Sequence, residues 1–133
     1  MKKLLIFVVD DDMDDLMLFQ DAINEIDPSI KIETAGNGVE AIKKLNGGLS
    51  ASPDYIFVDL NMPLMNGIQC LQEIKKIPSH SHIPVIIYST SSYERDIMQT
   101  ISNGAFHYIV KPFSFQELCD KLKKVLAMPR DVK

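Results

Sequence analysis

The apolar run at residues 55–58 leads directly into Asp59, and Pro63 closes the turn that follows. Such a short apolar run is typical of a strand that is buried on both faces, as the strands of parallel sheets are. An acid at the end of such a strand lies in the crevice outside the carboxyl ends, where open α/β sheets bind their ligands. Asp59 is therefore a candidate functional residue, although aspartate is also common in turns and helix caps.

Four other short apolar runs share this character, and we predict strands at residues 4–9, 30–35, 55–58, 84–88 and 106–110. Each run is followed by apolar residues at helical spacing. The predicted helices run from about Asp14 to Pro28, from Asn37 to Gly47, from Ile68 to Pro78, from Ser91 to Gly104 and from Ser114 to Pro129. Three pairs have the spacing of helix caps: Asn37 with Glu40, Ser91 with Glu94, and Ser114 with Glu117.

The alternation of strands and helices predicts right-handed crossovers, and hence an α/β fold with a doubly wound parallel sheet between two layers of helices. Periodicity does not fix the strand order, and the flavodoxin-like order 2-1-3-4-5 is one of two common solutions. A chain of 133 residues suits one domain. We place that domain at residues 1–128, with residues 129–133 as a short polar tail and no output domain.

The formal net charge of −4 argues against a nucleic-acid-binding surface, which requires a basic patch. The longest apolar stretch, residues 4–9, is far too short to cross a bilayer. Cys70 and Cys119 fall in apolar helical stripes, which indicates reduced thiols rather than a disulfide framework. We therefore expect a cytoplasmic protein without membrane insertion. His80 and His82 have no evident third metal ligand, so we expect them to be surface residues.

In a parallel sheet the carboxyl ends of all strands lie on one rim. Polar residues follow four of the predicted strands at that rim: Asp10 and Asp11, Asp59, Ser89 and Thr90, and Lys111. Carboxylates so placed repel one another unless a cation or a shared proton intervenes. Oxygen ligands without histidine or cysteine favour a hard ion such as Mg²⁺, and a nearby lysine suits a phosphoryl oxygen.

Five acids fall within residues 10–15. Asp12, Asp14 and Asp15 stand where a helix begins, and the helix macrodipole stabilises negative charge there. We assign this structural role to those three acids. Asp10 and Asp11 lie on the strand or just past it, so we assign the functional role to that pair.

With these residues in place, the sequence resembles the receiver domain of two-component response regulators, most of all the free-standing, chemotaxis-type (CheY-like) members. The resemblance covers residues 4–127 and implies the flavodoxin-like strand order 2-1-3-4-5. It rests on four motifs: Val8-Val9-Asp10-Asp11, Asp59-Leu60-Asn61-Met62-Pro63 followed by Asn66-Gly67, Ser89-Thr90, and Tyr108-Ile109-Val110-Lys111-Pro112-Phe113.

The resemblance implies that Asp59 is the phosphoacceptor. It also implies a Mg²⁺ site, with Mn²⁺ as a possible substitute. Asp59 and Asp11 would be direct ligands, Asp10 would hold the ion mainly through water, and the backbone carbonyl of Asn61 would complete the protein's share. Lys111 would contact the phosphoryl group and Asp59.

Further residues would bind or sense the phosphoryl group. Its oxygens would be bound by Asn61, Ser89, Thr90 and Lys111. Ser89 would be the switch hydroxyl, and Tyr108 the aromatic side chain that turns inward on activation. The change would be read on the face formed by the fourth helix, the fifth strand and the fifth helix.

The expected function is that of a stand-alone response regulator receiver that accepts its phosphoryl group from a sensor histidine kinase or a histidine phosphotransfer protein. It would signal to an unknown downstream protein through protein–protein contacts, as a monomer or as a phosphorylation-dependent dimer. It would catalyse its own phosphorylation and dephosphorylation and turn over no external substrate.

Other functions fit the sequence less well, but two stay open: a receiver that shuttles or drains phosphate, and an unphosphorylated protein-binding module. Phosphatases with an aspartyl nucleophile often carry a second acid two residues after it, and here that position is Asn61. A flavin-binding module would share the topology, but the acids after the first strand would repel the cofactor phosphate.

Overall fold

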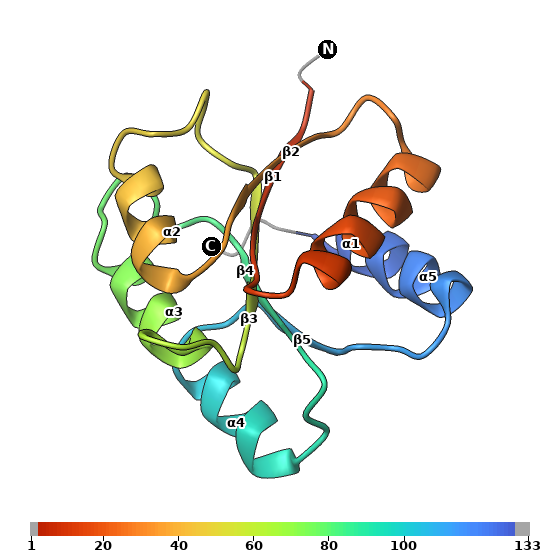
Figure 1. Cartoon of the computed structure of the whole chain (residues 1–133). Coiled ribbons are helices and arrows are strands. Elements are labelled where there is room, and N and C mark those ends of the chain that lie inside the picture. Colours follow the sequence, from red (N-terminus) through yellow and green to blue (C-terminus); the bar gives the residue numbers. More distant parts are fainter. Residues whose placement is uncertain (1–2, 130–133) are drawn as a thin grey trace.

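Five strands and five helices alternate along residues 3–129, the part of the chain that the computed structural model describes (Figure 1). The strands are β1 (Leu5–Val9), β2 (Lys31–Ala35), β3 (Tyr55–Asp59), β4 (Val85–Ser89) and β5 (His107–Val110). The helices are α1 (Met13–Ile26), α2 (Gly38–Leu45), α3 (Gly67–Lys75), α4 (Glu94–Ser102) and α5 (Phe115–Leu126). Every predicted strand and helix is present. Of the predicted tail, residues 130–133 lie outside the described part.

The strands form one parallel sheet in the order β2-β1-β3-β4-β5, so the flavodoxin-like order is confirmed. The register pairs Val9 of β1 with Val58 of β3, and Asp59 of β3 with Tyr88 of β4. The carboxyl ends of these strands therefore lie at nearly the same level. Residues that follow the strands consequently meet on one rim of the sheet.

Helices cover both faces of the sheet, with α1 and α5 on one face and α2, α3 and α4 on the other (Figure 1). Strands β1, β3 and β4 are buried along their whole length, which explains their unbroken apolar sequences. On the α1–α5 face, Phe57 packs edge-on against Phe19 of α1, with ring centroids 4.8 Å apart. On the opposite face, Ile56 and Val58 belong to the same core cluster as Leu71 of α3. Packing on both faces holds β3 in the centre of the molecule.

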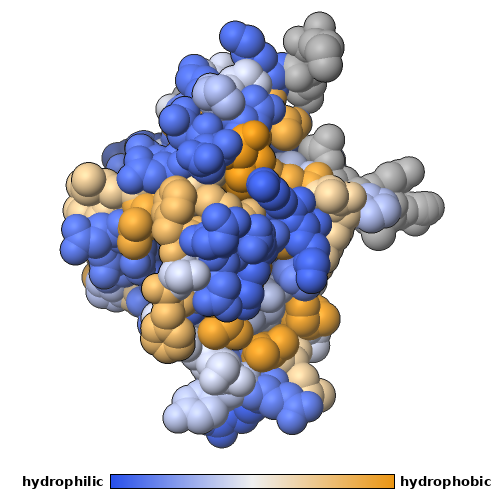
Figure 2. Space-filling view, turned by 90° about the vertical axis from the view of Figure 1, so that its right-hand side faces the viewer, coloured by the Kyte–Doolittle hydropathy of each residue, from blue (hydrophilic) through white to orange (hydrophobic). Residues whose placement is uncertain are grey.

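The outer surface of α1 and α5 is largely hydrophilic, with apolar side chains in small groups (Figure 2). On α1, the apolar side chains of Met13, Met17 and Leu18 are exposed. None of the helices within residues 3–129 is both long and apolar enough to cross a membrane. Cys70 and Cys119 are buried free thiols.

One local expectation is wrong. Ser91 does not cap α4, which begins after Tyr93 without a side-chain cap; the Ser91 hydroxyl instead donates to Asp96 at 2.5 Å. His82 is exposed, as expected, whereas His80 is half-buried and its Nε2 lies 3.0 Å from the carbonyl oxygen of Leu45. The predicted caps at Asn37 and Ser114 are present: each side chain accepts a hydrogen bond from the backbone three residues on.

Candidate functional site

The carboxylates of Asp10, Asp11 and Asp59 gather at the carboxyl ends of the neighbouring strands β1 and β3. One oxygen from each lies within 4.8 Å of the others. Asp10 is 1% exposed and Asp59 is 7% exposed, whereas Asp11 faces solvent. The structure thus brings together the three acids that the sequence placed on the rim, two of them with little access to water.

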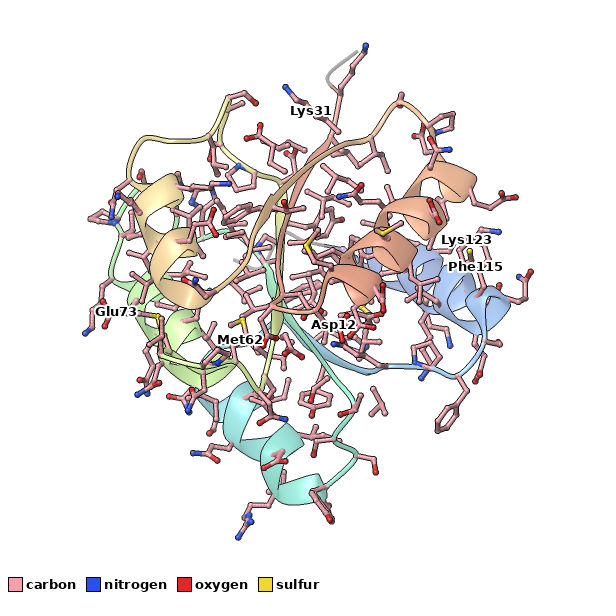
Figure 3. All side chains as sticks on the ribbon, viewed as in Figure 1. Asp12, Lys31, Met62, Glu73, Phe115 and Lys123 are labelled. Atoms are coloured by element: carbon pink, nitrogen blue, oxygen red, sulfur yellow. The ribbon has the colours of Figure 1, made fainter. Side chains whose placement is uncertain are left out.

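Local hydrogen bonds hold the start of α1 against this cluster. The Asp10 carboxylate accepts from the backbone N–H of Asp12 at 3.0 Å. Asp12 is the N-cap of α1, and its carboxylate accepts from the N–H groups of Asp14 and Asp15; Figure 3 shows Asp12 at the start of the helix. The structural role predicted for Asp12 is confirmed, and the cap fixes where the first turn of α1 lies relative to β1.

Lys111, just past β5, places its ammonium among the acids. Its Nζ lies 3.2 Å from an oxygen of Asp59, 3.1 Å from an oxygen of Asp10 and 2.6 Å from an oxygen of Asp15. The backbone N–H of Lys111 donates to the Ser89 carbonyl at 2.7 Å, which ties β5 to β4 beside the cluster. The ammonium also lies 4.9 Å from the ring centroid of Tyr88, close enough for a cation–π contact.

Asp15 and Tyr88 also contact Lys111, and neither contact is predicted by the sequence. Asp15 was assigned only a role at the start of the helix, and that assignment is incomplete. The sequence gives no separate signal for this contact, because a place at the helix start already explains Asp15. Tyr88 gave no signal beyond its place at the end of an apolar strand.

Burial strongly influences the charges at this site. It raises the pKa of Asp59 to about 6; the charges of Asp10 and Asp11 add to the effect, and Lys111 opposes it. Burial also raises the pKa of Asp10 against the lowering influence of the Asp12 N–H and of Lys111. Burial alone would lower the pKa of Lys111, but the hydrogen bond to Asp15 and the charges of Asp59 and Asp10 outweigh it and raise that pKa. At neutral pH the Asp59 carboxylate is therefore ionised and the Lys111 ammonium is charged.

The loop after β3 depends on a glycine. A Cβ at Gly67 would lie 2.6 Å from the carbonyl oxygen of Asp59 and 2.7 Å from Cα of Leu60. The Gly67 N–H donates to the Leu60 carbonyl at 2.7 Å, and α3 then begins with a reciprocal capping box between Asn66 and Gln69. This close approach of two backbone segments fixes the turn that follows Asp59.

The remaining predicted site residues lie around the rim. Asn61 and Thr90 are exposed, whereas Ser89 is fully buried and its hydroxyl accepts from the Ser91 N–H at 3.1 Å. Tyr108 is 9% exposed, and its hydroxyl donates to the Ser91 carbonyl at 2.8 Å. The Tyr108 ring is thus in an inward position. Ser91 is therefore hydrogen-bonded to both residues predicted to form the switch, Ser89 and Tyr108.

A family model for the response regulator receiver domain matches residues 6–123. The chain belongs to this family. Receiver domains are signalling modules of two-component systems, phosphorylated by histidine kinases and passing the signal to downstream proteins. The strand order and the rim of acids in this receiver domain agree with that assignment.

Two relatives differ in how much of their own length the receiver domain covers. It is 31% identical over 121 residues to the chemotaxis protein CheY1 of Helicobacter pylori, with 91% of this chain and 95% of CheY1 covered. It is 35% identical over 126 residues to a transcriptional regulatory protein CpxR homolog of Haemophilus influenzae, with 95% of this chain but only 51% of that protein covered. The chain therefore spans about half the length of that regulator and nearly all of CheY1.

Solved structures of response regulators are also similar to this chain. The phosphorylated cyanobacterial phytochrome response regulator RcpA aligns with a TM-score of 0.85 and 31% identity, covering 93% of this chain and 91% of RcpA. The Mn²⁺-bound form of response regulator Rcp1 aligns with a TM-score of 0.81 and 26% identity, covering 94% of this chain and 93% of Rcp1.

Receiver domains bind Mg²⁺ or Mn²⁺ at a cluster of aspartates, and the donors here fit such an ion. The three clustered groups are all carboxylates, with no histidine or cysteine among them. Hard divalent cations prefer oxygen donors of this kind. An exposed Asp11 beside two buried acids leaves one side of the cluster open to water, which suits an ion that keeps several waters.

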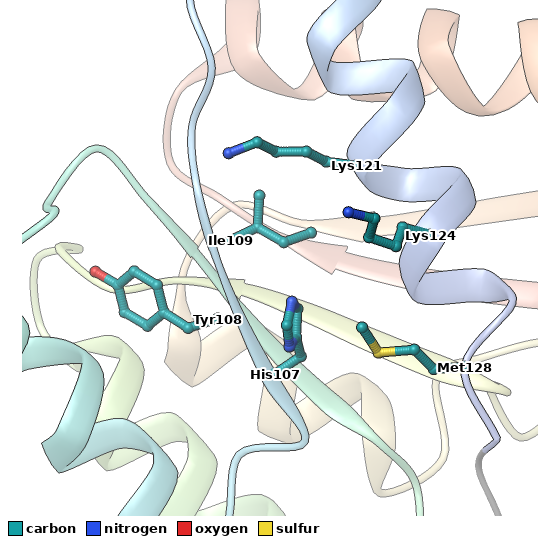
Figure 4. A pocket seen from close by; sticks show the side chains of 6 residues that line it. All are labelled: His107, Tyr108, Ile109, Lys121, Lys124 and Met128. Carbon is teal, nitrogen blue, oxygen red and sulfur yellow. The ribbon is translucent and has the colours of Figure 1, made fainter.

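A hollow of about 280 Å³ lies between β5 and α5, and none of these acids lines it (Figure 4). It is lined by His107, Tyr108, Ile109, Lys121, Lys124 and Met128. Burial and the charges of Lys121 and Lys124 lower the pKa of His107, so this imidazole is neutral at neutral pH. In Figure 4 the Tyr108 ring points to the opposite side of β5 from the two lysines. The receiver domain thus separates its acidic rim from a basic hollow.

Proposed function

We propose that this receiver domain accepts a phosphoryl group on Asp59 from a phosphohistidine of a sensor histidine kinase or a histidine phosphotransfer protein, and that it signals through protein–protein contacts. One observation carries the proposal: three carboxylates and the Lys111 ammonium converge on a single rim, with Asp59 3.2 Å from the lysine. A merely structural cluster would not require so many buried charges.

The chemistry follows from the state of Asp59. With a pKa of about 6, its carboxylate is ionised at neutral pH and can act as a nucleophile. One of its oxygens attacks phosphorus in line and forms an O–P bond, while the N–P bond of the phosphohistidine breaks. The electron pair stays on the imidazole nitrogen, which then takes up a proton. Lys111 neutralises charge on the phosphoryl oxygens, which is the main protein contribution to such transfers.

The remaining rim residues position these groups. Asp10, Asp11 and Asp59, with the backbone carbonyl of Asn61, would hold Mg²⁺, which when bound supplies further positive charge to the phosphoryl oxygens. Asn61 and Thr90 are exposed and would offer polar contacts to the incoming group. Hydrolysis of the acyl phosphate by an in-line water then ends the signal.

The switch would run through Ser91. The Ser89 hydroxyl now accepts from the Ser91 N–H, and the Tyr108 hydroxyl donates to the Ser91 carbonyl. If Ser89 turns to donate to a phosphoryl oxygen, it releases the Ser91 N–H, and the packing around Tyr108 changes with it. Helix α4, part of the face expected to change, carries exposed apolar side chains that suit a protein partner: Tyr93, Met98 and Ile101.

The proposal is tested by intact mass spectrometry after incubation with Mg²⁺ and acetyl phosphate. We expect one labile phosphoryl adduct on the wild-type protein and none on Asp59→Asn or in the presence of EDTA. Ser89→Ala should still accept the phosphoryl group but should no longer shift the NMR signals of Tyr108. An unmodified wild-type protein with an intact fold would overturn the proposal and favour an unphosphorylated binding module.

A further inference from the structure

We propose that Asp15, in the first turn of α1, competes with the phosphoryl group on Asp59 for the ammonium of Lys111 and thereby lowers the phosphorylated fraction. This inference rests on the proposed function of Asp59. Asp15 acts through Lys111, so it is a positioning residue rather than a catalytic one.

The contact between Asp15 and Lys111 is the shortest that the ammonium makes. It measures 2.6 Å, against 3.1 Å to Asp10 and 3.2 Å to Asp59. The side chains are 29% and 10% exposed, so the contact is largely shielded from water. Charge-assisted hydrogen bonds of this length are among the stronger ones in proteins. The ammonium is therefore held toward α1, on the Asp15 side of the cluster.

A lysine ammonium has three N–H donors and no acceptor. Here it faces three carboxylates, those of Asp10, Asp15 and Asp59. The ammonium donates hydrogen bonds to Asp10 and Asp15 and is ion-paired with Asp59. A phosphoryl oxygen on Asp59 would be a further acceptor, and it would compete with these existing partners for Lys111.

Asp15 is the partner that Lys111 can release most readily. The Asp10 side chain is 2% exposed, so losing Lys111 would leave a buried negative charge without its positive partner. The Asp59 carboxylate itself carries the incoming group. The Asp15 side chain is 29% exposed and can exchange the ammonium for water. Phosphorylation therefore breaks the Asp15 contact, and the free energy of that contact favours the unphosphorylated state.

Charge acts in the same direction. A phosphoryl group adds negative charge to the rim, and Asp15 adds a further negative charge beside the ammonium that should balance it. Removing the Asp15 charge should therefore favour the phosphorylated state both by freeing Lys111 and by reducing repulsion.

Asp14 provides the matched control. It lies in the same first turn, is exposed, and contributes the same charge to the N-terminus of α1. Within residues 3–129, the ion-pair partners of Lys111 are Asp10, Asp15 and Asp59, and Asp14 is not among them. An effect of the helix macrodipole or of net charge alone would appear in Asp14→Asn as well as in Asp15→Asn.

The experiment compares wild type, Asp15→Asn, Asp15→Ala and Asp14→Asn with Mg²⁺ and acetyl phosphate. For each protein it measures the rate of phosphorylation against donor concentration and the rate of hydrolysis after the donor is removed. We expect the steady-state ratio of phosphorylated to unphosphorylated protein to rise about three- to tenfold in both Asp15 variants, the scale of a partly exposed ion pair. We expect less than about a twofold change in Asp14→Asn, since exposed charges have small effects.

A second measurement needs neither metal nor phosphodonor. In the metal-free wild type and in Asp14→Asn, the ¹⁵N-labelled Lys111 ammonium should give an NMR signal protected from exchange with water. Asp15→Ala should lose that signal. An ammonium signal unchanged in Asp15→Ala would overturn the inference, because the contact would then not hold Lys111.

The outcomes separate the two proposals. No adduct on the wild-type protein overturns the proposed function and this inference with it. An adduct on the wild type, with equal phosphorylated ratios in Asp15→Asn and Asp14→Asn, overturns only the inference. A lower ratio in Asp15→Asn would also overturn it, because Asp15 would then support Lys111 rather than compete for it.

Discussion

Replacing Asp59 with asparagine should make the metal-free protein more stable at neutral pH, even though it removes the proposed phosphoacceptor. Burial raises the pKa of Asp59 to about 6 from its ordinary 3.8, with Asp10 and Asp11 adding to the effect and Lys111 opposing it. The folded protein therefore holds the Asp59 proton more tightly than the unfolded chain does. Above pH 6 the carboxylate is ionised in both states, and its charge opposes folding.

The magnitude follows from the same values. A difference of about 2 pH units corresponds to about 3 kcal/mol, at about 1.36 kcal/mol per unit. Asparagine has nearly the same shape, its amide oxygen can still accept from Lys111, and Lys111 keeps Asp10 and Asp15. We expect the free energy of unfolding at pH 7.5 to rise by about 1–3 kcal/mol. Because folded wild type protonates below pH 6, the gain should shrink as the pH falls from about 6 to about 4.

The assay is urea unfolding followed by circular dichroism, with EDTA present, at pH 7.5 and at pH 4.5. Asp14→Asn is the control, and its exposed charge should change stability by less than about 0.5 kcal/mol. Added Mg²⁺ should stabilise the wild type more than Asp59→Asn, because the variant lacks one of the clustered carboxylates. If Asp59→Asn is no more stable than the wild type at pH 7.5, the reasoning about burial and charge is refuted.

Two further predictions concern the turn after Asp59. Gly67→Ala should lower the free energy of unfolding by about 1–3 kcal/mol and slow phosphorylation, because the added Cβ would lie 2.6 Å from the Asp59 carbonyl oxygen; a wild-type urea midpoint would show that the turn can relax. Asn66→Ala removes the capping box of α3 and should lower stability by about 1 kcal/mol, measured in the same way. An unchanged midpoint in that variant would mean that water replaces the cap.

The sequence predicted the order of the strands and helices because the central strands are buried on both faces and their apolar runs are unbroken. The strand order came from the resemblance, since periodicity carries no information about which strands are neighbours. The predicted cap of α4 is wrong because a local pattern does not show contacts with distant parts of the chain either. Ser91 has the right spacing from Glu94, but its carbonyl accepts from Tyr108 and its hydroxyl donates to Asp96. The first of these contacts reaches across to β5 and cannot be seen in a local pattern.

The same limit applies to the candidate site. That Asp10, Asp11, Asp59 and Lys111 meet could be predicted, because the ends of parallel strands share a rim. That Asp15 joins them could not, because its partner Lys111 lies 96 residues away in the sequence. The contact depends on how the start of α1 is placed beside the end of β5. A local explanation for Asp15, its favourable place at a helix N-terminus, was available and physically sound, so nothing in the sequence called for a second one.

The charges at the rim do not balance without a further cation. Asp10, Asp11, Asp15 and Asp59 carry four negative charges when ionised and Lys111 carries one positive charge, which leaves an excess of three. In the metal-free protein, burial raises the pKa values of Asp10 and Asp59, and this excess of negative charge adds to the effect. A divalent cation would relieve most of it without protonating the nucleophile. A phosphoryl group would then restore part of the imbalance and draw Lys111 away from Asp15. The unbalanced charge that weakens the metal-free fold is therefore the same property that allows the site to respond to phosphorylation.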